Sequence, residues 1–210
     1  MPYDKQVLIL FNPDEAIRET EKAVLRKNPE LNGFSIETGL RLSGTELRAR
    51  LYLRLLTKES RLYLLGHGDW QSQTLGGFTA GHVCEYLRGL KAVGLISCLG
   101  CASARTEADE HRINLSNQSF VSKLHRLLWV DEDGPKLKTV MYGRVHKVLA
   151  ESGAVGKKTG DTVRSSLHHR AASKVRFYWD GDTQKAEWVT YKDATEDDYV
   201  EMRKHALSRQ

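Results

Sequence analysis

Short apolar runs alternate with segments of helical period along most of this 210-residue chain. The runs at residues 5–11, 61–65 and 93–97 are long enough for buried β-strands. The segments 15–27 and 80–89 lie between such runs and carry apolar residues at helical spacing, with Thr79 placed to cap the second of them. Alternation of this kind builds a mostly parallel sheet with helices on both of its faces. The sequence therefore predicts an α/β fold.

Further elements extend this pattern. A helix is predicted to begin at residues 43–46, where Leu47, Leu51 and Leu55 follow four residues apart, the spacing of an apolar helical face. The remaining predicted elements are strands at 34–37 and 137–142, a helix at 119–129, and strands at 174–179 and 187–191 that pair across a turn at 180–182. We expect the last strands to form a hairpin region at one edge of the sheet.

Composition and length fit one globular unit. Hydrophobic residues make up 40% of the chain and charged residues 28%, and 210 residues suffice for a single domain spanning 1–210. The chain contains no apolar run of membrane-spanning length and no signal peptide at its start, so we expect a cytoplasmic type of protein without a membrane span. Three cysteines are too few for a disulfide scaffold.

Charge is distributed unevenly. The net charge is +5, but residues 134–179 hold ten Lys and Arg against two acids, whereas residues 180–203 hold eight acids against three bases. A basic segment of this length favours a polyanionic partner, although a solvated surface gives the same pattern. We define a basic flap region at about 136–179 and an acidic tail at about 193–210.

Two residues with catalytic potential follow two of the predicted strands. His67 lies just after the strand at 61–65 and is flanked by glycines, and Cys98 ends the strand at 93–97. If these strands are neighbours in a parallel sheet, their ends lie about 5 Å apart, so an imidazole and a thiol share one cleft. The Gly68 N–H can then face a substrate carbonyl. Each residue alone is more often structural, but the pair favours a cysteine nucleophile with a histidine base.

The same segments resemble a known family. Residues 64–68 (LLGHG) and 95–98 (LISC) are similar to the signature of the caspase-like cysteine peptidases, a clan that includes caspases, gingipains and clostripain. Within that clan, the chain most resembles the self-processing cysteine protease domain of bacterial RTX and large clostridial toxins. Arg61 precedes the histidine by six residues as in that family, and residues 75–80 and 174–180 resemble its turn and its closing strand.

The resemblance implies a caspase-like three-layer sandwich with a β-hairpin flap at one edge of its sheet. It also implies an endopeptidase with a catalytic dyad of His67 and Cys98, activated by inositol hexakisphosphate bound in a basic cleft. The phosphate-binding residues carried over from the family are Lys27, Arg61, Arg144, Lys157, Lys158 and Lys174. The last four lie in the basic segment, and residues 151–158, with small residues before two lysines, suit a flap tip.

The resemblance also implies a biological setting. Family members are secreted by bacteria and act in the host cytosol on a protein substrate, which can be the toxin itself. The short segment before the first strand favours a free-standing effector that acts on another protein.

Other interpretations stay open. Cys98 and Cys101 form a CxxC pair, which occurs in zinc sites and in thioredoxin-like redox sites, and His67, His82, Cys84 and His111 are the other available zinc ligands. Because no second CxxC follows, we expect no metal. A catalytically silent module that binds inositol polyphosphates is the main alternative. Nucleic-acid binding is not expected, because the aromatic residues at 177–179 lie on a predicted core strand.

Overall fold

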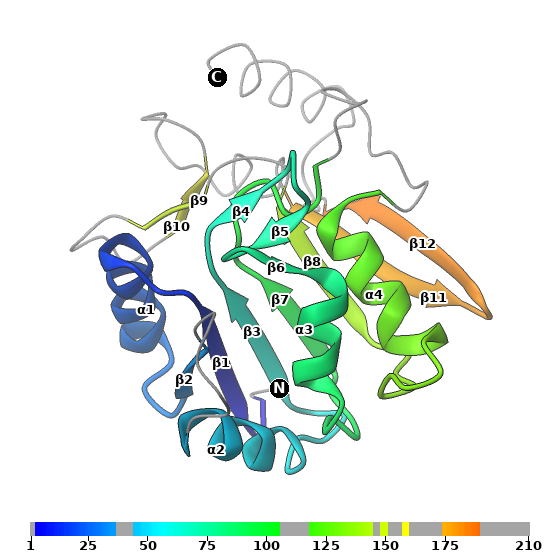
Figure 1. Cartoon of the computed structure of the whole chain (residues 1–210), viewed down its shortest axis with the longest axis horizontal. Helices are drawn as coiled ribbons and strands as arrows, with labels where there is room; N and C mark the ends of the chain where they lie inside the picture. The colour runs from blue at the N-terminus through cyan, green and yellow to red at the C-terminus, as the bar shows by residue number, and fades with distance from the viewer. Residues whose placement is uncertain are drawn as a thin grey trace.

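The computed structural model describes residues 3–36, 44–105, 118–144, 148–150, 157–159 and 174–189. Seven strands form one sheet in the order β12-β11-β8-β7-β3-β1-β2 (Figure 1). Their bounds are β1 Gln6–Phe11, β2 Asn32–Ile36, β3 Arg61–Leu65, β7 Leu95–Cys98, β8 Val140–Arg144, β11 Lys174–Asp180 and β12 Thr183–Trp188. The five strands from β8 to β2 pair in parallel, and β11 and β12 add antiparallel pairs at one edge. The predicted α/β fold with a mostly parallel sheet is confirmed.

Four helices lie within the described residues, at α1 Glu15–Lys27, α2 Gly44–Leu53, α3 Ala80–Leu87 and α4 Phe120–Val130. Three of them begin at residues whose side chains accept a backbone N–H, as N-caps do. Asp14 accepts from Ile17, Thr79 from His82, and Ser119 from Ser122. Short polar side chains therefore fix where these helices start.

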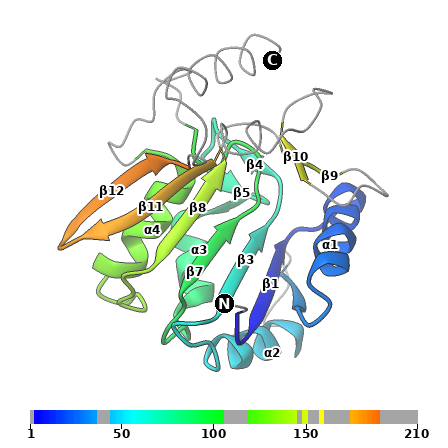
Figure 2. The same cartoon turned by 180° about the vertical axis from the view of Figure 1, so that it is seen from behind.

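Alternate residues of the central strands supply two separate apolar clusters. In β1, Leu8 and Leu10 pack with Ile17 and Val24 of α1. The intervening residues of β1 face the other way and join a larger cluster to which α2, α3 and α4 contribute. Helices consequently cover both faces of the sheet, α1 on one and the other three on the opposite face (Figures 1 and 2). None of the helices in the described part of the chain has the length and apolar character that crossing a bilayer requires.

The orientation of α2 differs from the simplest expectation. Its buried residues are Ala49 and Leu53, whereas Leu47, Leu51 and Leu55 are exposed to solvent. Apolar residues four positions apart occur on both sides of α2. The sequence pattern alone therefore does not tell which side packs on the core.

Two small antiparallel sheets complete the described structure. Strands β4 Gly68–Asp69, β5 Thr74–Leu75 and β6 Phe78–Thr79 form one of them, in the loop that follows β3. Strands β9 Val148–Ala150 and β10 Lys157–Thr159 form the other, inside the predicted flap region. The acidic tail lies outside the described residues.

Candidate functional site

The carboxyl ends of β1, β3 and β7 lie side by side. The registers pair Leu10 with Leu65 and Leu64 with Cys98, and the Leu99 N–H donates to the Leu64 carbonyl at 2.7 Å. The two strands expected to carry the histidine and the cysteine are therefore parallel neighbours, as predicted. Loops that leave these three strands meet at one edge, where parallel α/β sheets hold their functional groups.

His67 is exposed at this edge and is held by a carboxylate. Its Nε2 lies 2.8 Å from Oδ2 of Asp14, the residue that caps α1. The backbone N–H of Ile17 and the His67 imidazole both lower the pKa of Asp14. Sequence reasoning missed Asp14 as a site residue. Its signal was its place three residues beyond the end of β1, the neighbour of β3.

The backbone of His67 is fixed independently of its ring. Its carbonyl accepts the Gly76 N–H at 2.6 Å, and the Gly76 carbonyl in turn accepts from Nδ2 of Asn12 at 2.7 Å. These bonds join the loop after β1, the loop after β3 and the turn between β5 and β6. The position of the imidazole is therefore set by three segments of the chain.

Gly68 and Cys101 are packed against each other. A Cβ atom on Gly68 would overlap the carbonyl oxygen of Cys101, so this close approach requires glycine. The Cys101 side chain is half-buried in the turn after β7. We name Asp14, His67, Gly68 and Cys101 together the His67 edge.

Cys98 lies in a different environment, although only two residues separate it from Cys101. It is 1% exposed, and burial raises the pKa of its thiol to about 11, despite opposing hydrogen bonds from Gly100 and Ser103. A thiol with this pKa is protonated at neutral pH. The burial of Cys98 and the raised pKa of its thiol therefore argue against Cys98 as the nucleophile. Its sequence position at the end of a strand did not indicate this burial.

Three of the expected phosphate ligands come together on one face of the sheet. Arg61 begins β3, and Arg144 and Lys174 are partners in the pairing of β8 with β11. We name Arg61, Arg144 and Lys174 the cationic face. Two aromatic rings lie among them: the Arg61 guanidinium lies 4.4 Å from the Tyr63 centroid, and Nζ of Lys174 lies 3.8 Å from that of Tyr142.

Electrostatics show that these cations influence one another. The pKa of Lys174 falls to about 8, chiefly because the amine is buried, and also because Arg144 and Arg61 repel its charge. Nε of Arg61 is buried and has no hydrogen-bond partner among the described residues. Partly buried like charges and an unsatisfied donor favour an anion at this place.

The other expected ligands are placed only by their backbones. Lys27 is the last residue of α1, and Lys157 and Lys158 lie in β10. Strand β9, the partner of β10, lies beside α1. The side chains of these three lysines lie outside the described part of the structure.

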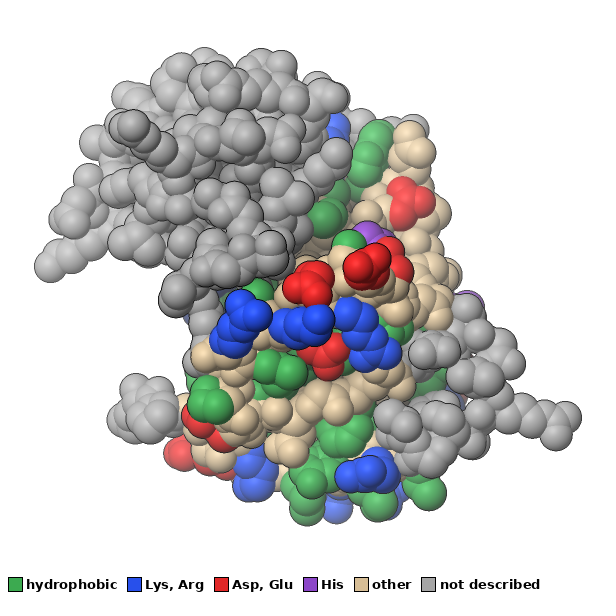
Figure 3. Space-filling view, turned by 90° about the vertical axis from the view of Figure 1, so that its left-hand side faces the viewer, with side chains coloured by type: hydrophobic (Ala, Val, Ile, Leu, Met, Phe, Trp, Pro, Cys, Tyr) green, Lys and Arg blue, Asp and Glu red, His purple; other side chains and the backbone are tan. Residues whose placement is uncertain are grey.

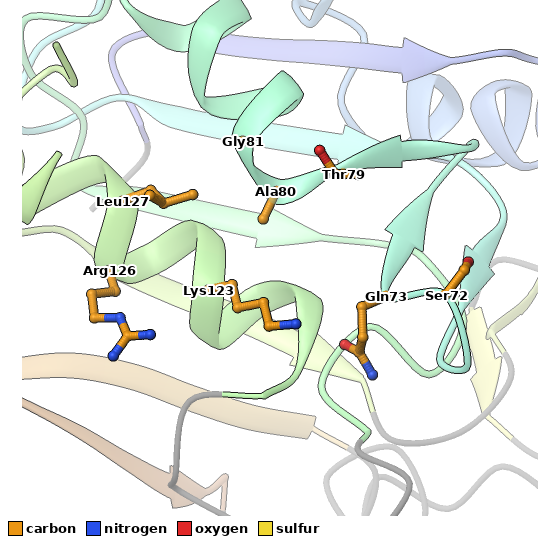
Figure 4. Close-up of a pocket in the computed structure, with 8 residues that line it drawn as sticks. All are labelled: Ser72, Gln73, Thr79, Ala80, Gly81, Lys123, Arg126 and Leu127. Atoms are coloured by element: carbon orange, nitrogen blue, oxygen red, sulfur yellow. The ribbon is translucent and has the colours of Figure 1, made fainter.

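A cavity of about 350 Å³ opens between α3 and α4 (Figure 4). Its lining is Ser72, Gln73, Thr79, Ala80, Gly81, Lys123, Arg126 and Leu127. Gln73 connects the cavity to the loops of the His67 edge, because its Nε2 donates to the carbonyls of Trp70 and Arg105. Lys123 points toward Gln73, whose Oε1 is buried and has no hydrogen-bond partner within the part of the chain that the structure describes.

The described residues contain no group of three or more His, Cys, Asp or Glu side chains arranged to hold a metal ion. All three cysteines carry free thiols. Of the zinc ligands considered, His111 lies outside the described residues, and Cys84 is buried with its pKa raised to about 11. Compared with models of protein families and with curated proteins, the chain matches none.

Proposed function

We propose that this chain is a cysteine endopeptidase in which His67 is the base and Cys101 the nucleophile. The observation that carries the proposal is the His67 edge. His67 is paired with the Asp14 carboxylate, and the next residue, Gly68, packs against the backbone of the half-buried Cys101. Nucleophilic cysteines need this combination of a base, a group that orients the base, and access to substrate.

Cys101 replaces Cys98 in this proposal for reasons of burial and position. A nucleophile must reach a substrate carbonyl. Cys98 does not reach one, because it is buried in the core, and the pKa of its thiol is raised. Cys101 packs on the residue that follows His67 and retains access to solvent. Cys98 then has the structural part of closing β7.

The reaction follows from this arrangement. Asp14 occupies Nε2 of His67, which leaves Nδ1 to take the thiol proton of Cys101. The thiolate attacks the peptide carbonyl carbon, and the backbone N–H of Gly68 stabilises the oxyanion. His67 returns the proton to the leaving amine, and a thioester remains. Water, deprotonated by His67, then cleaves the thioester, releases the acid and restores the thiol.

The cavity between α3 and α4 supports a place for one substrate side chain. Ala80 and Leu127 give it apolar walls, and Lys123 and Gln73 supply a donor and an acceptor at its edge. A side chain with an apolar stem and a polar end fits this lining.

Activation by inositol hexakisphosphate is the regulatory part of the proposal, and the cationic face is its site. The backbone of Arg144 also contacts the turn that carries the nucleophile. Its N–H donates to Oγ of Ser103 at 3.2 Å, and its carbonyl accepts from Ala104 at 2.8 Å. An anion bound by Arg144 and Lys174 stabilises the β8–β11 pairing and, through these two bonds, the turn next to Cys101.

With that activator, the proposed setting is the cytosol of a host cell, after secretion by a bacterium. The proposed fold type is the caspase-like sandwich, with β9 and β10 as part of its flap. The proposed partners are a protein substrate and an inositol polyphosphate.

The test is cleavage of a quenched fluorescent peptide library by the purified protein, with and without inositol hexakisphosphate. Cleavage is expected to require the activator, to vanish in Cys101→Ala, and to persist in Cys98→Ala. The second candidate, a silent binding module, is favoured by the unsatisfied Arg61 Nε on the cationic face. Calorimetric binding of the ligand with no cleavage of any peptide would support it instead.

A further inference from the structure

The outer face of α2 carries three exposed leucines. Leu47, Leu51 and Leu55 are exposed by 59%, 52% and 57%, and they recur every four residues. Leu55 belongs to the same helical ridge, because its N–H donates to the Tyr52 carbonyl just past the end of α2. Their equal spacing aligns them in one stripe along the helix. We name these three residues the leucine stripe.

Cationic side chains flank the leucine stripe. Arg48 lies on α2 between Leu47 and Leu51 in sequence, Arg54 directly precedes Leu55 just past the end of the helix, and both side chains are exposed. Lys58 follows in the next turn of chain and is also exposed. Within the described residues none of the three forms an ion pair. Residues 44–59 hold four cations and two acids.

The stripe is not needed for the fold. The opposite side of α2 already fills the core through Ala49 and Leu53. Figure 3 shows hydrophobic and basic side chains gathered at the lower end of the molecule, where α2 lies. Apolar side chains bordered by cations match the interface of an anionic bilayer, where leucines enter the acyl boundary and arginines meet phosphate groups.

We propose that the leucine stripe, with Arg48, Arg54 and Lys58, docks this protein on the surface of an anionic phospholipid membrane. A second copy of the chain is a poorer occupant, because pairing two stripes would bring arginines of like charge together. The surface lies at the amino-terminal end of the sheet, opposite the His67 edge (Figure 1). Docking there leaves the carboxyl ends of the strands facing away from the bilayer.

The test is co-sedimentation with vesicles of phosphatidylcholine alone and of phosphatidylcholine mixed with phosphatidylserine. The wild-type chain is expected to bind the mixed vesicles at low salt. A triple variant Leu47→Ser, Leu51→Ser, Leu55→Ser is expected to bind about tenfold more weakly or worse. Arg48→Gln with Arg54→Gln is expected to weaken binding and to reduce its dependence on salt. Val130→Ser is the matched control, because Val130 is 53% exposed on α4, and it is expected to change nothing.

Thermal unfolding shows whether each variant is folded, and the exposed positions predict midpoints close to wild type. Absence of binding to the mixed vesicles overturns the proposal, as does equal binding by the folded triple variant. A wild-type dimer in light scattering that the triple variant converts to a monomer, without vesicle binding, assigns the stripe to a second copy instead. None of these outcomes depends on peptidase activity.

Discussion

The His67 edge and the apolar interior each hold a histidine and a cysteine, in opposite environments. At the edge, His67 is exposed and paired with Asp14, and Cys101 keeps partial access to solvent. In the interior, His125 and Cys98 are fully buried. The pKa of His125 falls to about 4, and that of Cys98 rises to about 11, both because burial disfavours charge. The same two residue types are thus accessible to solvent in one region and held neutral by burial in the other.

The comparison shows that residue type and order along the chain do not assign chemistry by themselves. His125 is satisfied where it lies: its Nε2 is 2.8 Å from the Thr139 carbonyl, and its Nδ1 is 2.9 Å from Nε2 of Gln184. Because a carbonyl only accepts, the His125 proton is on Nε2. The ring also stacks on Trp179. These contacts fix a neutral imidazole as part of the packing.

The largest expected effect separates the two cysteines. Cys101→Ala is expected to lower kcat/KM by about a thousandfold or more, because the proposed nucleophile is lost, with little change in stability. Cys98→Ala is expected to retain activity and to lower the free energy of unfolding by about 1 kcal/mol, because a buried side chain is truncated. Peptide cleavage and urea unfolding of both variants measure this contrast. Loss of cleavage in folded Cys98→Ala alone would reverse the assignment.

The next effect tests how His67 is held. Asp14→Asn keeps a good helix cap but removes the carboxylate, so kcat is expected to fall by about ten- to a hundredfold with stability nearly unchanged. Asp14→Ala is expected to lose the same activity and also about 1 kcal/mol of stability, because α1 loses its cap. The kcat of each variant and its thermal midpoint distinguish these two functions. Full activity in Asp14→Asn would remove Asp14 from the site.

Much of the fold could be predicted from the sequence, because its signals are local. The apolar run at 61–65 and the cap at Thr79 each specify an element without reference to the rest of the chain. Neighbouring placement of the strands that lead to His67 and Cys98 followed from the general behaviour of parallel sheets.

Three features of the site and the surface could not be predicted from the sequence, because they depend on tertiary structure. Asp14 reaches His67 only because β1 and β3 are neighbours, although 53 residues separate the two side chains in sequence. Cys98 is buried because its side chain belongs to the apolar cluster that α2, α3 and α4 cover, which depends on how those helices pack on the sheet. The outward orientation of Leu51 could not be predicted either, because α2 carries apolar residues on two opposite sides and either side could pack on the core. The period of apolar residues therefore predicts helices and strands, but not the burial and contacts of the side chains that they carry.

A smaller effect concerns the cationic face, where burial leaves Lys174 with a pKa of about 8. Raising the pH through 8 removes its proton in the free protein, so the affinity for inositol hexakisphosphate is expected to fall several-fold between pH 7 and 9. Lys174→Arg keeps its charge and is expected to lose this dependence. Calorimetry measures the affinity of both proteins at each pH. Because the ligand's own phosphates titrate equally in both experiments, the difference between the two proteins reports Lys174 alone. Identical pH profiles for the two proteins would exclude Lys174 from the binding site.

The smallest effect concerns His125. Its folded pKa of about 4 is below the unfolded value of about 6.5, so the unfolded chain binds more protons between these limits. Stability is therefore complete above pH 6.5 and falls as the pH drops toward 4, by at most about 1.4 kcal/mol per pH unit. His125→Gln is expected to flatten this slope without altering the pH profile of cleavage. Urea unfolding across this range measures the slope, and an unchanged slope in the variant contradicts the burial argument.

The most direct measurement of the central claim is the site of covalent labelling. A peptide that carries a thiol-reactive group in place of its scissile bond is incubated with the protein and inositol hexakisphosphate, and the adduct is mapped by mass spectrometry. We expect an adduct on Cys101 that disappears in His67→Ala, with Cys98 unmodified. An adduct on Cys98, or labelling of Cys101 that does not need His67, would contradict it.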